Sequence, residues 1–388
     1  MELGRKFKAI GRSEPGKGAG GRIRFTTYSY TVTRVRVMKS RLLREEDYMR
    51  MRKMGLNEMI RFLEESEHKG EIDSLSKRYR GAELVELAMN ESLANVVNKL
   101  LRISLKEELK FIIEFYSEKW ILNNVKLVLR TKMNRLGEDD LKYGIVPIKP
   151  TGYEACLRLY RESGEGFLEE ISAITHIDAA RLGELYRAND LVGLENEIDV
   201  SFYRRLMALK RRIRMGPNDP LKQFFEHLIY LMNIKNIVRF KNEGLDEDTI
   251  RKMIVMEPSG RLAVRERGLA GRKGRRLMEG IIRAKDVKTV FERLKQSPYK
   301  DLVTAEVEQT PSRLEGSIEK FLLMYASKLL HRKPLSVSPI FGYLLWKEIE
   351  TKNLKLLVHA KAMGLDEKFV DANLIVVDDS VLKVMKNA

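Results

Sequence analysis

The sequence predicts an all-α protein that is built from three tandem helical modules. Apolar residues recur at helical spacing along almost the whole chain, as at Val32, Val35 and Met38. Prolines lie mostly between these stretches, where helices can end. A nine-residue pattern also occurs three times, which indicates internal repetition. Alternating apolar and polar residues are confined to 141–148 and 374–377, the two candidate strands.

The repeated pattern begins at three asparagines. It reads N-V-K-L-V-L-R-T-K from Asn124, N-I-K-N-I-V-R-F-K from Asn233 and N-L-K-L-L-V-H-A-K from Asn353. Each copy has Asn, Lys two residues on and Arg or His six residues on, with aliphatic residues between them. These positions are Asn124, Lys126 and Arg130; Asn233, Lys235 and Arg239; and Asn353, Lys355 and His359.

Other markers keep the same distance from the asparagines. Gly-Leu-Asp-Glu starts eleven residues after both Asn233 and Asn353, and Arg-Leu-Gly-Glu takes that place after Asn124. Pro-Thr-Gly at 150–152 and Pro-Ser-Gly at 258–260 follow the first two asparagines at offsets of 26 and 25. Several independent markers in register indicate that the chain is triplicated.

Elementary helix geometry explains the repeated segment. In the first copy Val125, Val128 and Leu129 face one side, whereas Lys126 and Arg130 face the other. Glycine suits the left-handed residue after a helix, and Asp suits the N-cap of the next. We therefore expect a helix, a tight corner and another helix in each module. We interpret the motif as structural; the alternative is a surface on which three basic stripes converge.

The markers divide the chain into four parts. These are a basic, glycine-rich leader at 1–24 and helical modules at 25–135, 136–245 and 246–388. The third module is the longest because a basic stretch, 261–276, is inserted after its Pro-Ser-Gly.

The net charge of +17 favours an acidic partner, either nucleic acid, anionic lipid headgroups or an acidic protein surface. Seven Lys/Arg lie in the leader, and seven lie in the insertion against Glu266 alone. Glycines interrupt the insertion, so we do not expect it to be a strong helix on its own. The candidate interface consists of Arg265, Arg267, Arg272, Lys273, Arg275 and Arg276. The alternative for this stretch is a solvated loop.

Motifs for chemistry are absent from the sequence. The single cysteine, Cys156, excludes a disulfide framework, and the five histidines never fall into a paired ligand spacing. A glycine pattern at 11–18 imitates a phosphate-binding loop, but no Ser or Thr follows Lys17. We therefore predict no catalytic residue, cofactor or metal. There is no export signal, and no stretch reaches the roughly 18 apolar residues of a membrane helix.

The chain resembles one known family over residues 28–378, and three sets of residues carry this resemblance. They are Tyr28-x-Tyr30 with the string R-V-R-V-M-K-S at 34–40, the three Asn-x-Lys motifs, and P-I-F-G-Y-L at 339–344. The chain resembles the C subunit of archaeal-type rotary ATPases, which is related to the d subunit of vacuolar ATPases.

This resemblance implies three similar helical domains around a pseudo-threefold axis, shaped as a funnel without an active site. It implies a peripheral position on the cytoplasmic face of the cell membrane. There the protein would join the central shaft subunits to the membrane proteolipid ring of a complex that links ATP to proton or sodium transport. The leader and the insertion are more basic than the family pattern, which makes anionic lipid headgroups a further candidate partner.

Two rival functions rest on weaker evidence. Charge alone favours a nucleic-acid-binding scaffold, but the basic residues are spread over many helices and form no recognised binding module. A helical protein-interaction scaffold is the other rival. We therefore expect no nucleic-acid partner.

Overall fold

A computed structural model describes residues 23, 26–214, 216, 219–255 and 272–376. Within these ranges the regular elements are all helices, and the only sheet-like pairing is an isolated bridge between Ile23 and Ile213. The all-α prediction is confirmed. The two candidate strands were wrong: α8 covers the start of 141–148, and the described part of 374–377 follows the last helix.

The helices follow one another along the chain in this order: α2 (Ser29–Lys39), α3 (Glu45–Lys53), α4 (Leu56–Glu64), α5 (Lys69–Leu75), α6 (Gly81–Ile103), α7 (Glu107–Met133), α8 (Asp139–Lys142), α9 (Tyr153–Arg161), α10 (Gly164–Thr175), α11 (Ala179–Arg187), α12 (Leu191–Arg212), α13 (Pro220–Asn242), α14 (Glu247–Met253), α15 (Arg272–Ile282), α16 (Val287–Lys295), α17 (Ala305–Gln309), α18 (Leu314–His331), α19 (Ser338–Met363) and α20 (Glu367–Asn373). Short 3₁₀ turns, η2 (Lys300–Leu302) and η3 (Pro311–Arg313), flank α17.

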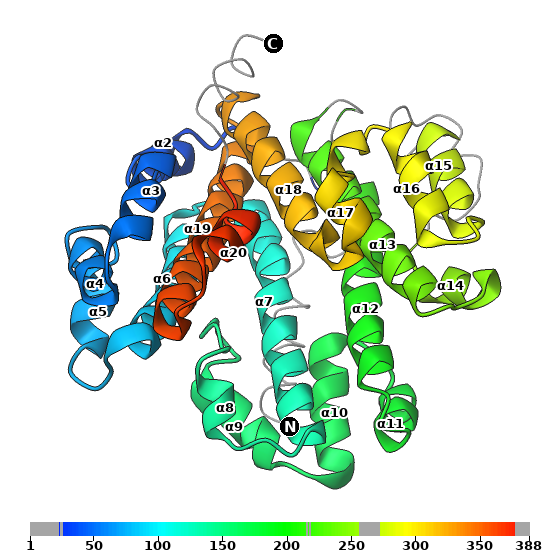
Figure 1. Ribbon diagram of the computed structural model, residues 1–388, viewed down its shortest axis with the longest axis horizontal. Helices are drawn as coiled ribbons and strands as arrows, with labels where there is room; N and C mark the ends of the chain where they lie inside the picture. The colour runs from blue at the N-terminus through cyan, green and yellow to red at the C-terminus, as the bar shows by residue number, and fades with distance from the viewer. Residues whose placement is uncertain (1–22, 24–25, 215, 217–218, 256–271, 377–388) are drawn as a thin grey trace.

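The long helices form three hairpins, α6–α7, α12–α13 and α18–α19, and the members of each pair pack together. The connections within the hairpins are short, at 104–106, 213–219 and 332–337. Figure 1 shows the long helices in the middle of the molecule. The shorter helices form three groups at its edge: α3–α5 on the left, α8–α11 at the bottom and α14–α16 on the right.

Each long helix that carries an Asn motif ends in the predicted tight corner. Gly244 and Gly364 adopt left-handed backbone conformations, with φ of 77° and 65°. In the first copy Arg135 takes this position with φ of 55°, which explains why that corner matched the pattern less well. Asp246 and Asp366 cap the next helices by accepting bonds from backbone N–H groups, so both cap predictions are confirmed.

The P-I-F-G-Y-L motif explains how α18 and α19 pack closely. Ile340, Phe341, Tyr343 and Leu344 are fully buried at the start of α19. A Cβ on Gly342 would lie 2.8 Å from the backbone oxygen of Ala326. Glycine therefore lets α18 and α19 approach at a distance that any larger residue would prevent.

The buried clusters join helices across the corners. One cluster combines the second half of α13 with α14–α17 and the start of α18. Another combines α3–α6 with the second half of α19 and α20, so parts near the two ends of the chain share one core. The largest cluster contains residues of α7–α12. It also contains the ends of α6, α13, α18 and α19 that lie next to the hairpin connections.

The predicted division at 135/136 and 245/246 stays a prediction, and buried clusters extend across both positions. The reason is that α7 and α13 reach from a hairpin to a corner, and their second halves pack on the helices that follow the corner.

Three residues before and at the start of α2, Ile23, Tyr28 and Thr31, hydrogen-bond to residues of all three hairpins. The carbonyl of Ile23 accepts a bond from the N–H of Arg214, at 2.8 Å. The N–H of Tyr28 donates to the carbonyl of Leu335, also at 2.8 Å, and the Thr31 hydroxyl donates to the last carbonyl of α6 at 3.0 Å. These three residues therefore tie the hairpins together at one end.

Candidate functional site

The three motif asparagines make the same pair of hydrogen bonds. Each side-chain amide donates to the carbonyl of the residue 22 positions later, at 2.7 to 2.8 Å, and each side-chain oxygen accepts the N–H of that residue at 3.0 to 3.1 Å. The asparagines are almost fully buried. Their partners are Val146, Val255 and Ile375. We call these three pairs the asparagine clamps.

The clamps explain why these residue types occur at this spacing. An extended segment after each corner buries one backbone donor and one acceptor, which are costly to leave unpaired. A primary amide supplies both complements from one side chain. The first clamp is more extensive, since the Asn124 amide also donates to the Thr151 carbonyl at 2.9 Å.

The basic residues of the first motif face acidic residues on α12. The Lys126 ammonium lies 2.8 Å from Asp199, and the Arg130 guanidinium donates two bonds to Glu195, one of them at 2.9 Å. The Glu195 bond outweighs partial burial and raises the pKa of Arg130. These two cations therefore hold α7 against α12.

The other two stripes also face neighbouring helices, but among the described residues only part of each stripe forms an ion pair. Lys235 of α13 pairs with Glu315 of α18 at 3.6 Å, and Arg239 lies over the Phe240 ring. On α19, Lys355 donates to Asn90, and His359 lies 3.2 Å from Glu86; both partners are on α6.

The residues that face the basic stripes have a spacing of their own, and all but one of them, Asn90, are acidic. Glu195 and Asp199, Glu315 and Glu319, and Glu86 and Asn90 are each four residues apart on a helix that faces a basic stripe. The spacing i, i+4 is visible in the sequence. Which acidic pair faces which basic pair is a tertiary property, because α6 precedes its partner α19 by most of the chain.

Two stripes meet at a central cavity of about 670 Å³ between α7, α12, α13, α18 and α19. Its lining includes six Lys or Arg and five carboxylates, so the two signs nearly balance. They are Lys119, Lys126, Arg130, Lys235, Arg239 and Lys352, with Glu195, Asp199, Glu315, Glu319 and Glu348. Lys355 and His359 do not line it. The alternative of three converging basic stripes is therefore wrong, because the third stripe packs on α6.

Comparison with known proteins decides the family. The model of the ATP synthase (C/AC39) subunit family matches residues 31–372. The chain belongs to this family.

Individual relatives agree with the assignment. The chain is 29% identical to the C subunit of the A-type ATP synthase of Methanococcoides burtonii, over 90% of its own length and 95% of the relative's. It is 28% identical to the C subunit of the A-type ATP synthase of Methanosarcina acetivorans, covering 91% and 94% of the two chains. For the same protein of Haloferax volcanii the identity is 28%, with 89% and 97% covered.

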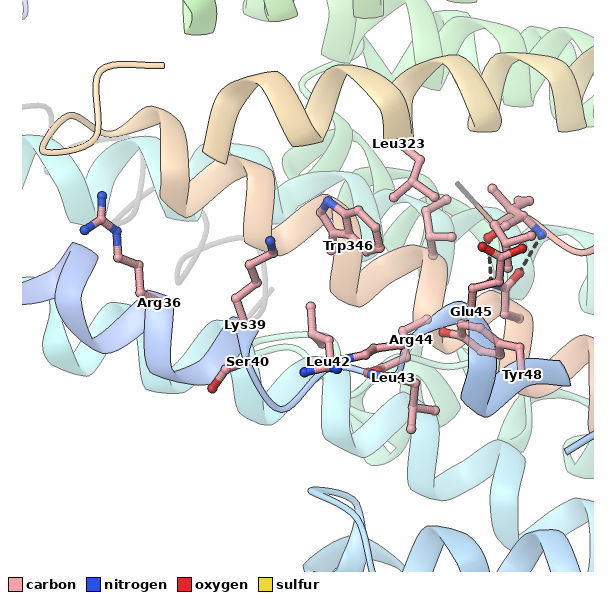
Figure 2. Close-up of a pocket in the computed structure, with 15 residues that line it drawn as sticks. Arg36, Lys39, Ser40, Leu42, Leu43, Arg44, Glu45, Tyr48, Leu323 and Trp346 are labelled. Atoms are coloured by element: carbon pink, nitrogen blue, oxygen red, sulfur yellow. Dashed lines mark hydrogen bonds between the residues drawn. The ribbon is translucent and has the colours of Figure 1, made fainter. Parts of the chain in front are cut away.

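This chain has a second cavity, of about 360 Å³, which lies between α2, the start of α3 and α19. Figure 2 shows Lys39 beside Trp346 on its wall, and the Lys39 ammonium lies 5.9 Å from the centre of that ring. Leu323 and Ile349 form an apolar floor, and Arg36 adds a further cation to the rim.

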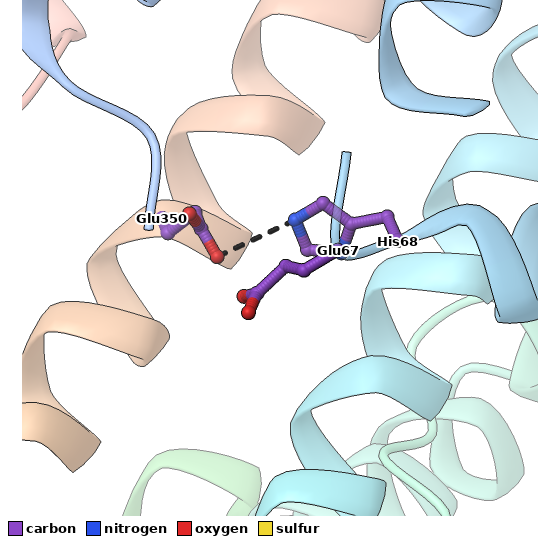
Figure 3. Close-up of side chains that lie close together, drawn as sticks. All are labelled: Glu67, His68 and Glu350. Atoms are coloured by element: carbon purple, nitrogen blue, oxygen red, sulfur yellow. Dashed lines mark ion pairs between the residues drawn. The ribbon is translucent and has the colours of Figure 1, made fainter. Parts of the chain in front are cut away.

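The one group of possible metal ligands among the described residues is Glu67, His68 and Glu350 (Figure 3). His68 Nε2 lies 3.4 Å from Glu350. The ammonium of fully buried Lys347 lies 2.5 Å from Glu67 and 2.6 Å from Glu350. Burial opposes ionisation of Glu350, but Lys347 and His68 overcome it and hold the pKa of that carboxyl well below its usual range. Lys347 therefore already supplies the charge that a metal ion would bring.

The basic insertion is only partly described. Arg265 and Arg267 lie outside the described residues. Arg272 and Lys273 begin α15, followed by half-buried Arg275 and exposed Arg276. The end of the stretch is thus helical, because Met278, Ile281 and Ile282 anchor α15 in the core.

Two further sequence expectations concern reactivity and membranes. Cys156 is buried, and burial raises the pKa of its thiol to about 12, which disfavours the nucleophilic thiolate. Among the residues that the structure covers, no helix combines the length and apolar character that crossing a bilayer requires.

Proposed function

We propose that this chain is the non-catalytic central-stalk subunit of an A-type rotary ATPase, which joins the central shaft to the membrane proteolipid ring. It turns with the rotor on the cytoplasmic face of the cell membrane and couples ATP chemistry to proton or sodium transport. Its membership of the ATP synthase (C/AC39) subunit family supports this role.

The observation that carries the proposal is the way the hairpins are locked. Each of three long helices is pinned to the segment beyond its corner by an asparagine clamp, and a basic stripe fixes it to an acidic helix. Ile23, Tyr28 and Thr31 tie the hairpins at one end. A part that transmits torque must resist shear, and buried polar pairs that fit in one arrangement provide that resistance.

The repeated clamps also support a pseudo-threefold arrangement. In this proposal Asn124, Asn233 and Asn353 occupy equivalent places in three similar units around the central cavity. The third unit is completed by α3–α6 from the beginning of the chain, which pack on α19 and α20. A funnel of this kind presents a roughly round body to a ring, and its cavity is the candidate seat for the foot of the shaft.

Isolation of the native complex tests the assignment. A tag on this chain should recover the proteolipid and the shaft subunits from detergent-solubilised membranes in a fixed ratio, with or without nuclease. Recovery of nucleic acid, or of head subunits without proteolipid, would contradict the proposal. The insertion 261–276 stays a predicted secondary contact, and changing Arg275 and Arg276 to Glu should then weaken retention of the ring.

A further inference from the structure

Exposed apolar residues mark the end of the molecule where the hairpin connections lie. The exposed fractions are 53% for Tyr30, 71% for Leu105 and 47% for Leu335. These residues are close together, because the N–H of Tyr28 donates to the Leu335 carbonyl and Thr31 donates to the carbonyl of Ile103. We define the hairpin end as residues 26–34, 102–108, 211–214, 216, 219 and 331–337.

The hairpin end is strongly basic. In sequence it holds eight Lys or Arg and three acidic residues. All three acids are engaged: Glu107 with Lys110, Glu108 with the Tyr28 hydroxyl, and Asp219 with Lys333. Seven of the eight cations are exposed; one of them, Lys333, pairs with Asp219, and the other six make no ion pair with the described acids of this end. These six are Arg34, Arg102, Lys106, Arg211, Arg214 and Arg332.

The corners that follow α7, α13 and α19 carry the opposite net charge, although the last helical turn before each corner is basic. The corners at 134–142, 243–248 and 364–371 hold ten acidic residues and three Lys or Arg. Leu136 and Leu365 are exposed there as well, at 46% and 41%. Exposed leucines alone therefore do not distinguish the two ends, because single ones are ordinary. The sign of the charge does.

From this polarity we infer that the hairpin end binds the anionic headgroups of a phospholipid bilayer, with Tyr30, Leu105 and Leu335 entering the interface. Interfacial proteins combine basic residues with a few apolar or aromatic side chains in this way. Attraction to the surface decays within about 8–10 Å in ordinary salt, so the cations that act are those that lie close to the bilayer, as those of the hairpin end would. The inference takes its setting from the proposed function, and it turns the acidic corners away from the membrane.

This surface differs from the one that the sequence predicted. The described part of the insertion lies in α15, which packs on α16 and belongs to the group of short helices at the right of Figure 1. The hairpin end is formed by connections that are distant in sequence, so only the fold brings its cations together.

Vesicle co-sedimentation of the purified full chain tests the inference. The probes are phosphatidylcholine vesicles with and without phosphatidylglycerol. The chain should bind the anionic vesicles and not the neutral ones. Changing Lys106 and Arg332 to Ala should weaken binding about 30-fold, since each cation near an anionic surface contributes roughly 1 kcal/mol. The matched control changes Lys77 and Lys368, two exposed lysines away from this end, and should bind as the wild type does.

A second pair of variants separates charge from insertion. At high salt the charge variant, Lys106→Ala with Arg332→Ala, should bind vesicles as the wild type does. The double change Leu105→Ser and Leu335→Ser should still weaken binding under that condition. The corresponding control is Leu136→Ser with Leu365→Ser. Circular dichroism melts confirm that each variant folds. Equal loss in test and control pairs, or no binding to anionic vesicles, would overturn the inference.

The same variants distinguish a lipid partner from a protein partner. If the isolated chain ignores anionic vesicles while Lys106→Ala with Arg332→Ala releases it from the solubilised ring, acidic protein loops are the partner. The lipid inference is then wrong and the rotor assignment stands. If the chain binds anionic vesicles but recovers no proteolipid from membranes, the proposed function fails and the lipid surface stands.

Discussion

Replacing Asn233 with Ala tests the asparagine clamps most cleanly. The change leaves the N–H and the carbonyl of Val255 without their partner, and Val255 is only 3% exposed. A buried backbone group that loses its partner costs about 1–3 kcal/mol, so we expect a loss of roughly 2–5 kcal/mol in unfolding free energy. Asn353→Ala should cost about the same. Asn124→Ala should cost more, because the Thr151 carbonyl also loses a donor.

The assay combines urea unfolding, followed by circular dichroism, with hydrogen exchange of the Val255 amide. That amide donates to Asn233, so its exchange should accelerate in Asn233→Ala before the rest of the chain changes. Asn123→Ala is the control, since Asn123 is exposed and precedes the clamp residue Asn124 on the same helix. It should be neutral or slightly stabilising, because Ala is the better helix former by roughly half a kcal/mol. An unchanged midpoint and an equally protected Val255 amide in Asn233→Ala would refute the reasoning.

Three other predictions concern single buried groups. Burial raises the pKa of the Cys156 thiol to about 12, so a thiol reagent should label Cys156 only after unfolding, and fast labelling of the native chain would contradict this. Burial, with Lys328 nearby, lowers the pKa of His227 from 6.5 to about 4. As the pH falls, the unfolded chain therefore binds this proton before the folded chain does. The free energy of unfolding should be at its full value above pH 6.5 and should decline towards pH 4. His227→Gln should make that decline smaller in urea titrations at a series of pH values. Lys347→Met removes the buried ammonium that pairs with Glu350 and Glu67 and leaves buried Glu350 with only His68 and the Leu43 N–H, so it should cost about 3–5 kcal/mol. Exposed Lys77→Met should cost almost nothing in the same urea assay.

The helical fold and its corners were predictable because local rules decide them. Spacing of apolar residues, glycine after the helix and Asp at the N-cap act within a few residues, and the structure follows them at Gly244 and Gly364. The candidate strands failed for an instructive reason. Residues around Val146 and Ile375 are extended and half buried, which produces alternation, but their backbone partner is an asparagine side chain rather than another strand.

The site was less predictable because it depends on contacts between distant residues. The sequence singled out the motif lysines and arginines, yet nothing local revealed that Lys126 meets Asp199 or that His359 meets Glu86. Counting Lys and Arg along the sequence found the insertion, where the cations lie within 16 residues of one another. It missed the hairpin end, where Lys106 and Arg332 are separated by more than half of the chain.

The central claim is that this chain couples the shaft to the membrane ring, and the ratio of ions pumped to ATP hydrolysed measures it directly. The comparison is between membranes that carry the complete complex and membranes from which this chain has been deleted. We predict that the deleted membranes retain ATP hydrolysis by the head but pump no ions, and that adding back the chain restores both the pumping and the ratio. Membranes that lack the chain and still pump ions at the normal ratio would contradict the account.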